Sequence, residues 1–141
     1  MMIYICSPLR GETNEIIREN MMKTREYIDI INRCLAPKVR SVAPHAYLPE
    51  MLDDNDPTQR ELALDFGLKL LSLCDTMIVV GDRISEGMRG EIEIANQKDM
   101  PVTYVSDEVM AQLLNSEIEA IAGFQEDFSN MLEVLYWQVE Q

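Results

Sequence analysis

The run Thr76–Val80 constrains the fold of this chain more than any other segment. Its five residues are apolar or β-branched at every position, with no alternation of polar and apolar side chains. Strands with this pattern are buried on both faces, as in parallel sheets that helices cover on each side. We therefore expect Thr76–Val80 to be a central strand of an α/β protein.

Short strand patterns and longer helical patterns alternate along the rest of the chain. Apolar residues in the first helical pattern recur at spacings of three, four or seven, and Pro37 ends it. Asp56 followed by Pro57 is a typical helix start, with the acid as cap and proline in the first turn. The predicted elements are strands over residues 2–7, 38–43, 76–80 and 101–105, and helices over residues 12–35, 57–73 and 86–98.

This alternation predicts an α/β fold, a doubly wound parallel sheet of four or five strands flanked by helices. Right-handed crossovers favour the strand order 2-1-3-4, with strands one and three in the centre. We expect an α/β domain over residues 1–106 and a C-terminal helical extension over residues 107–141, because the character of the chain changes there.

The C-terminal extension carries apolar residues at heptad spacing from residue 117 onward. Ile121, Phe128 and Leu135 lie seven residues apart, as do Phe124 and Met131. Such a helix either packs on its own domain or pairs subunits, and the sequence leaves both open. Three further residues add apolar area to this helix: Leu132, Tyr136 and Trp137.

Composition narrows the classes of partner and the compartment. The chain of 141 residues has 12 basic and 25 acidic residues and a net charge of −13, which disfavours binding to nucleic-acid polymers. No run approaches the roughly 20 apolar residues of a membrane helix, so we expect no membrane partner. Three scattered cysteines fit reduced thiols in a cytoplasmic protein better than a disulfide framework. A single histidine argues against a metal site.

The predicted topology brings particular loops to one place. Ligands of open parallel sheets bind beyond the carboxyl ends of the strands, where the strand order reverses. Here that point lies between strands one and three, so the loops at residues 7–11 and 81–88 should meet there, with His45 beside them. Ser7, Arg10 and Gly11 belong to the first of these loops.

The loop at residues 81–88 leads into a helix that suits an anionic ligand. Ser85 is a typical N-cap, and the free amides of the following turn would face the cavity. Gly87 would let a ligand approach the backbone closely. Glu91 follows the cap by six residues, shares a helix face with Met88, and could direct its carboxylate into the same cavity. On this pattern alone, Ser85 could equally be a plain cap and Glu91 a solvated glutamate.

The motifs resemble those of the nucleoside 2-deoxyribosyltransferase superfamily, which includes the 2'-deoxynucleoside 5'-phosphate N-hydrolases. The resemblance covers about residues 2–105, and its motifs are Ile3–Gly11, Cys74-Asp75 and Ser85–Ile92 with Ala95. The chain looks closest to an uncharacterised branch of the superfamily with the stretches 43–46, 52–57 and 67–71.

The resemblance implies that Glu91 attacks the anomeric carbon of a nucleoside or nucleoside 5'-monophosphate. A carboxylate both stabilises an oxocarbenium-like centre and traps it covalently. It also implies that the turns Ser85–Gly87 and Arg10–Gly11 hold the substrate end, that His45 contacts base or ribose, that no cofactor takes part, and that the protein is a homodimer or a higher homo-oligomer.

One position departs from the family pattern. Those enzymes carry an aspartate eight residues before the one that matches Asp75, and here that position is Gly67. Asp54, Asp56 or His45 could replace it. The alternative function is therefore a catalytically inactive nucleotide-binding module, a sensor or sequestering protein on the same fold.

Two less favoured hypotheses use other residues. Cys6 could be a nucleophile activated by His45, although a cysteine inside an apolar strand usually fills a core. Asp53, Asp54 and Asp56 could bind a divalent cation, although an acidic loop before a helix cap explains them equally well.

Overall fold

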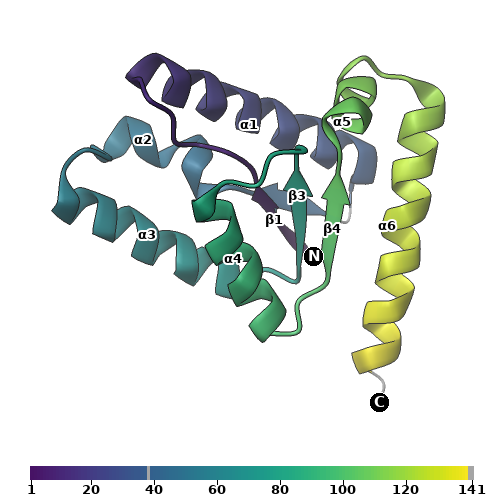
Figure 1. The fold of residues 1–141 in the computed structure, drawn as a ribbon. Helices are drawn as coiled ribbons and strands as arrows, with labels where there is room; N and C mark the ends of the chain where they lie inside the picture. The colour runs from purple at the N-terminus through teal and green to yellow at the C-terminus, as the bar shows by residue number, and fades with distance from the viewer. Residues whose placement is uncertain (38, 140–141) are drawn as a thin grey trace.

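The computed structural model describes residues 1–37 and 39–139, which form an α/β fold (Figure 1). The predicted strands and helices are all present, with ends that differ by a few residues. The elements are β1 (Met2–Cys6), α1 (Asn14–Leu35), β2 (Arg40–Val42), the 3-10 helix η1 (Pro44–Ala46), α2 (Leu48–Met51), α3 (Pro57–Ser72), β3 (Thr76–Val80), α4 (Glu86–Gln97), β4 (Val102–Val105), α5 (Asp107–Leu114) and α6 (Ile118–Val139).

The four strands form one parallel sheet in the order β2-β1-β3-β4, which confirms the predicted topology. The central strands β1 and β3 are in register with Ile3 opposite Thr76 and Cys6 opposite Val79. All five residues of β3 are buried, as its uninterrupted apolar pattern predicts.

Alternate side chains of β1 and β3 pack into two separate cores. Ile3, Ile5, Ile78 and Val80 join the larger core with α1, α5 and α6. The opposite side chains of the two strands join a smaller core with α3 and α4. Strand periodicity therefore places the α1 layer on one face of the sheet and the α3–α4 layer on the other.

Helix α3 turns much of its apolar surface to solvent. The side chains of Leu62 and Phe66, which the sequence places on one face with Leu70 and Leu73, are 58% and 51% exposed. Only Leu71 of this helix is fully buried. Large apolar side chains of a surface helix usually face the core, so this exposed apolar surface is unusual for a single chain.

Two helices, rather than one, follow β4. The short helix α5 was not expected, although Ser106 caps it and two acidic residues occupy its first turn. Phe124 and Phe128 of α6 are buried in the same core as the sheet, and Gln125 donates a hydrogen bond of 2.8 Å to the Cys34 carbonyl of α1. Ile121 and Met131 of the predicted strip are partly buried against the same core. The other apolar residues of the strip lie outside the side chains that the structure describes: Leu132, Leu135, Tyr136 and Trp137.

None of the helices in the described part of the chain combines the length and the apolar character needed to cross a membrane.

Candidate active site

Glu91 lies in the second turn of α4, which a capping interaction starts at a defined residue. Ser85 is the N-cap, and its hydroxyl accepts a hydrogen bond of 3.3 Å from the Met88 amide. The Ser85 amide in turn donates to the Met88 sulfur at 3.5 Å. The reciprocal pair fixes where the helix begins, and so fixes the direction in which Glu91 points.

The carboxyl group of Glu91 is directed into the protein. Its Oε2 atom is buried and has no hydrogen-bond partner among the described residues. Burial raises the pKa of Glu91 to about 7, and a hydrogen bond from the Tyr4 hydroxyl partly opposes this shift. A carboxyl group with this pKa is present in both charge states near neutral pH, which is a property of functional carboxylates.

Tyr4 is the partner that the sequence analysis did not single out. It lies on β1 and is 2% exposed, and burial together with the nearby Glu91 carboxylate raises its pKa well above the ordinary value. Tyr4 therefore stays protonated and donates to Glu91. The signal that could have found it is a hydroxyl-bearing side chain within a strand otherwise formed by apolar residues and cysteine.

Gly67 lies on α3 opposite this pair. A Cβ atom at this position would lie 3.9 Å from the Tyr4 hydroxyl and 3.5 Å from Pro44 Cγ, both ordinary van der Waals distances. Position 67, where the family pattern has an aspartate, thus faces the Tyr4–Glu91 pair. In this chain the position has no side chain, and unfilled space takes the place of a carboxylate.

The aspartates proposed as substitutes for that carboxylate have other partners. Asp54 forms an ion pair of 3.2 Å with Arg10. Asp56 caps α3 by accepting from the Thr58 amide at 2.9 Å. Asp65, two residues from Gly67, forms an ion pair of 3.0 Å with Lys69 on the exposed side of the helix.

Ser7 and His45 are brought together, with a third residue that was not expected. Ser7 Oγ lies 2.7 Å from His45 Nε2 and 2.9 Å from Thr24 Oγ1, and Thr24 donates to the Asn20 carbonyl at 2.9 Å. Thr24 occupies the gap of seven residues in the apolar stripe of α1, between Met21 and Ile28. A polar residue at a buried stripe position is the signal that could have found it.

The order of donors in this network follows from the number of hydrogens. Thr24 uses its single hydroxyl hydrogen on the carbonyl, so Ser7 donates to Thr24 and accepts from His45 Nε2. Burial lowers the pKa of His45 to about 4, so the ring is neutral and its Nδ1 atom is an acceptor. His45 consequently does not act as a base for Ser7.

Arg10 and Gly11 lie away from Glu91 in the loop after β1. Arg10 lines a cavity of about 340 Å³ with residues from the start of α3, and Glu91 is not among the lining residues. A Cβ atom at Gly11 would collide with the side chain of Ile16. Packing against α1 is therefore one reason for a glycine at this position.

Gly87 and Met88 differ in exposure. A Cβ atom at Gly87 would meet no atom within 4 Å, so the backbone is open there. Met88 is 1% exposed and its side chain belongs to the core between the sheet and α4. Its sulfur accepts from the Ser85 amide on the inner side of the turn, so the side chain is not free to contact a ligand.

The residues of the two less favoured hypotheses lie apart. Cys6 is fully buried, its sulfur lies 3.8 Å from the Met88 carbonyl, and burial raises its pKa far above the ordinary value. His45 pairs with Ser7 on the other face of the strand. Among the described residues there is also no group of three or more His, Cys, Asp or Glu placed to hold a metal ion.

Comparison with known structures supports the fold. Four chains of known structure match, and one of them is a 2-deoxyribosyltransferase from the psychrotolerant bacterium Bacillus psychrosaccharolyticus. The similarity covers 75% of this chain and 72% of that enzyme, with a TM-score of 0.57 and 16% identity. At this identity the similarity shows a shared fold, and that enzyme is described as a biocatalyst for nucleoside synthesis.

Comparison of the sequence with curated proteins finds no match. Residues 1–105 match the family described as Domain of unknown function (DUF7768). The matched part contains the four strands and the helices from α1 to α4. The chain therefore belongs to the DUF7768 family.

Proposed function

We propose that this protein cleaves or transfers at the N-glycosidic bond of a nucleoside or nucleoside 5'-monophosphate, with Glu91 as nucleophile. The observation that carries the proposal is the buried, unpartnered Oε2 atom of Glu91 beside the protonated Tyr4 hydroxyl. An unsatisfied buried carboxyl oxygen is costly, and such groups persist where they act on a ligand.

The proposed reaction has two steps. The ionised Glu91 carboxylate bonds to the anomeric carbon while the bond to the base breaks, and the electron pair leaves with the base, which takes a proton from a solvent water molecule. Water or a second base then attacks the same carbon, loses a proton and releases the Glu91 carboxylate. Tyr4 holds the carboxylate in place through its hydroxyl, and the reaction requires no cofactor.

Substrate contacts would come from the ends of the central strands. The open backbone at Gly87 and the capped turn at Ser85 suit a substrate hydroxyl or phosphate, with Met88 contributing its backbone alone. His45 would accept a hydrogen bond through Nδ1, while Ser7 orients its ring.

The loop Arg10–Gly11 would bind the phosphate of a nucleoside 5'-monophosphate if the ligand displaces Asp54 from its ion pair with Arg10. The guanidinium group is about half exposed in that pair, so exchange of partners is geometrically open.

Gly67 favours a second candidate function, a nucleotide-binding module without turnover. The position beside the Tyr4 hydroxyl has room for a side chain but provides no proton donor for the departing base. A site of this kind without its acid could bind and release a nucleotide as a sensor does.

One experiment separates these two functions. The protein is incubated with a panel of 2'-deoxynucleosides, ribonucleosides and their 5'-monophosphates, with and without a second base, and free base is measured by liquid chromatography. Release by the native protein and by Glu93→Gln, but not by Glu91→Gln, supports the enzyme. Saturable binding without release supports the module, and absence of both overturns the proposal.

We further propose that two copies associate through α3 in the cytoplasm. Five large apolar side chains, four in this helix and one at its C-cap, are between 44% and 69% exposed. Asp65 and Lys69, which lie among these apolar side chains, form an ion pair and neutralise each other. This face therefore repels a second acidic chain less strongly than the rest of the acidic surface does. The five side chains are those of Leu62, Leu64, Phe66, Leu68 and Leu73.

Sedimentation of the native protein and of Phe66→Glu tests the association. We expect a dimer or larger species for the native chain and a monomer for the variant, with circular dichroism verifying that the variant is folded. A native chain that sediments as a monomer at all concentrations would refute the proposal.

A further inference from the structure

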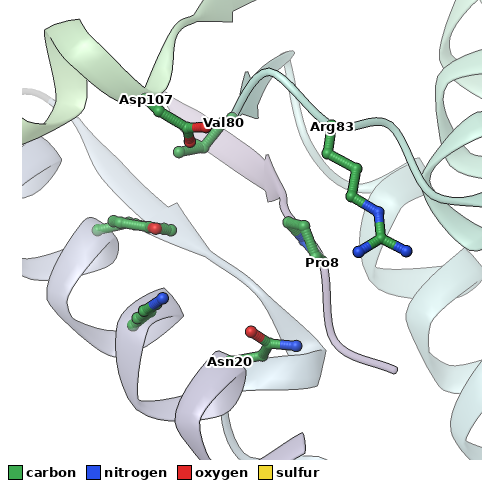
Figure 2. A pocket seen from close by; sticks show the side chains of 8 residues that line it. Pro8, Asn20, Val80, Arg83 and Asp107 are labelled. Atoms are coloured by element: carbon green, nitrogen blue, oxygen red, sulfur yellow. The ribbon is translucent and has the colours of Figure 1, made fainter. Parts of the chain in front are cut away.

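A second cavity lies at the carboxyl ends of the two central strands, on the opposite side of the sheet from Glu91. It has a volume of about 140 Å³, and residues from both strand ends, from α1 and from the start of α5 line it (Figure 2). Its lining residues are Pro8, Asn20, Lys23, Tyr27, Val80, Gly81, Arg83 and Asp107.

The cavity belongs to the α1 layer. Val80 is part of the core that α1, α5 and α6 share, whereas Tyr4 and Met88 belong to the core under α4. Lys23 and Tyr27 lie four residues apart on α1, so they project from the same helix face. None of the residues assigned to the Glu91 site lines this cavity.

Two cations reach the cavity without a partner of their own. Neither Lys23 nor Arg83 forms an ion pair within residues 1–37 and 39–139, although the chain has 25 acidic residues. Arg83 lines the cavity from the loop after β3, and Figure 2 shows its side chain running past Pro8, with Asn20 and Asp107 on the other side of Pro8. Lys23 and Arg83 line the cavity from two different elements, α1 and the loop after β3, and arginine and lysine around one cavity are typical of oxyanion recognition.

The carboxylates nearby are held by backbone groups. The Asp82 amide donates to Asp107 Oδ2 at 3.4 Å, and the Asp107 amide donates to Asp82 Oδ1 at 3.3 Å. This reciprocal pair joins the loop after β3 to the start of α5, beside the cavity that Asp107 lines. Asp107 can still accept a hydrogen from a hydroxyl of the ligand, which a phosphate monoanion or monoester provides.

Neutral polar groups complete the lining. Asn20 uses its amide nitrogen on the Leu9 carbonyl at 3.0 Å, which leaves its oxygen as an acceptor. The pKa of Tyr27 is raised by burial and by the nearby Asp107 and Glu26 carboxylates, so Tyr27 remains a hydroxyl donor. The cavity thus offers two cations, one hydroxyl donor and two acceptors.

The volume of the cavity limits the ligand. It corresponds to about five water molecules at roughly 30 Å³ each, below the roughly 300 Å³ at which pockets for drug-sized ligands begin. We propose that this cavity binds a phosphate group, as inorganic phosphate or as the end of a small phosphate monoester, between Lys23 and Arg83 and independently of Glu91.

Titration calorimetry with inorganic phosphate at constant ionic strength tests the proposal. We expect saturable binding by the native protein, and about tenfold or greater weakening in Lys23→Gln and in Arg83→Gln, since each removes a charge-assisted contact. Arg89→Gln removes an exposed cation of α4 outside the cavity and should bind like the native protein, as should Glu91→Gln.

The outcomes separate this site from the proposed nucleoside site. Binding that survives the double variant Lys23→Gln/Arg83→Gln, or that is lost in Arg10→Gln instead, would place phosphate elsewhere and overturn the proposal. Absence of saturable binding by the native protein would also overturn it. Circular dichroism of each variant distinguishes a lost site from a lost fold. This experiment measures phosphate binding alone, and Glu91→Gln is expected to retain that binding. Failure of the glycosidic assay would therefore not change the conclusion about the phosphate site.

Discussion

Replacing Glu91 by glutamine should stabilise the protein at alkaline pH. Burial raises the pKa of Glu91 from 4.5 to about 7, so the folded state favours the neutral carboxyl group. The stability that this group contributes is complete below the unfolded pKa and is lost as the pH rises through 7. Glutamine has nearly the same shape and cannot ionise, so the variant does not suffer this loss.

The expected magnitude follows from the two pKa values. A shift of about 2.5 units corresponds to about 3.4 kcal/mol at full ionisation. At about pH 5.5 the unfolded chain is mostly ionised and the folded chain is not, and Glu91→Gln should already be more stable by about 1.4 kcal/mol. At about pH 8.5 the difference should reach about 3.4 kcal/mol, an increase of about 2 kcal/mol between the two conditions.

Urea unfolding followed by far-UV circular dichroism at both pH values measures this difference. Glu93→Gln is the matched control, because Glu93 lies on the same helix with an exposed side chain. Its difference from the native protein should be the same at both pH values. A free-energy gap for Glu91→Gln that stays constant or narrows with rising pH would refute the assignment of a buried, destabilised carboxylate.

Three further substitutions test other parts of the site. Gly67→Asp should fold, because a Cβ atom has room at this position. Repulsion between the new carboxylate and Glu91 should shift the pH dependence of any Glu91-linked activity to higher pH. The control Gly90→Asp, at an open position, should leave the pH dependence unchanged. Gly81→Ala should lower the free energy of unfolding by about 1 to 2 kcal/mol in thermal melts, because φ at Gly81 is 105°, whereas Gly90→Ala should raise it slightly. Ser7→Ala should cost about 1 to 3 kcal/mol in urea unfolding, since it leaves the buried Nε2 atom of His45 without its partner; an unchanged midpoint would argue against the hydrogen bond between Ser7 and His45.

Local sequence determined the secondary structure and the strand order. Thr76–Val80 is apolar or β-branched at every position because helices cover both of its faces, and that pattern is readable without a structure. Helix starts were equally readable at Ser85 and Asp56, since the cap is a contact between residues two or three apart. The signal for α5 at Ser106 was of the same kind but the helix is short, and it was missed.

Contacts between distant segments decided what the sequence could not specify. The pKa of Glu91 depends on how deeply α4 buries it and on Tyr4, 87 positions earlier along the chain. The neutral state of His45 depends on its burial, and its tautomer depends on a hydroxyl network through Ser7 and Thr24 from two other elements.

The exposure of α3 was likewise a tertiary outcome. Periodicity shows which residues of a helix share a face, but this helix has apolar residues on more than one face. Only packing against the sheet decided that Leu71 is buried while Leu62 and Phe66 are exposed. The physical reason is general: caps and strand patterns depend on neighbours within a few residues, whereas burial, and the pKa values that it shifts, depend on every segment that folds around a side chain.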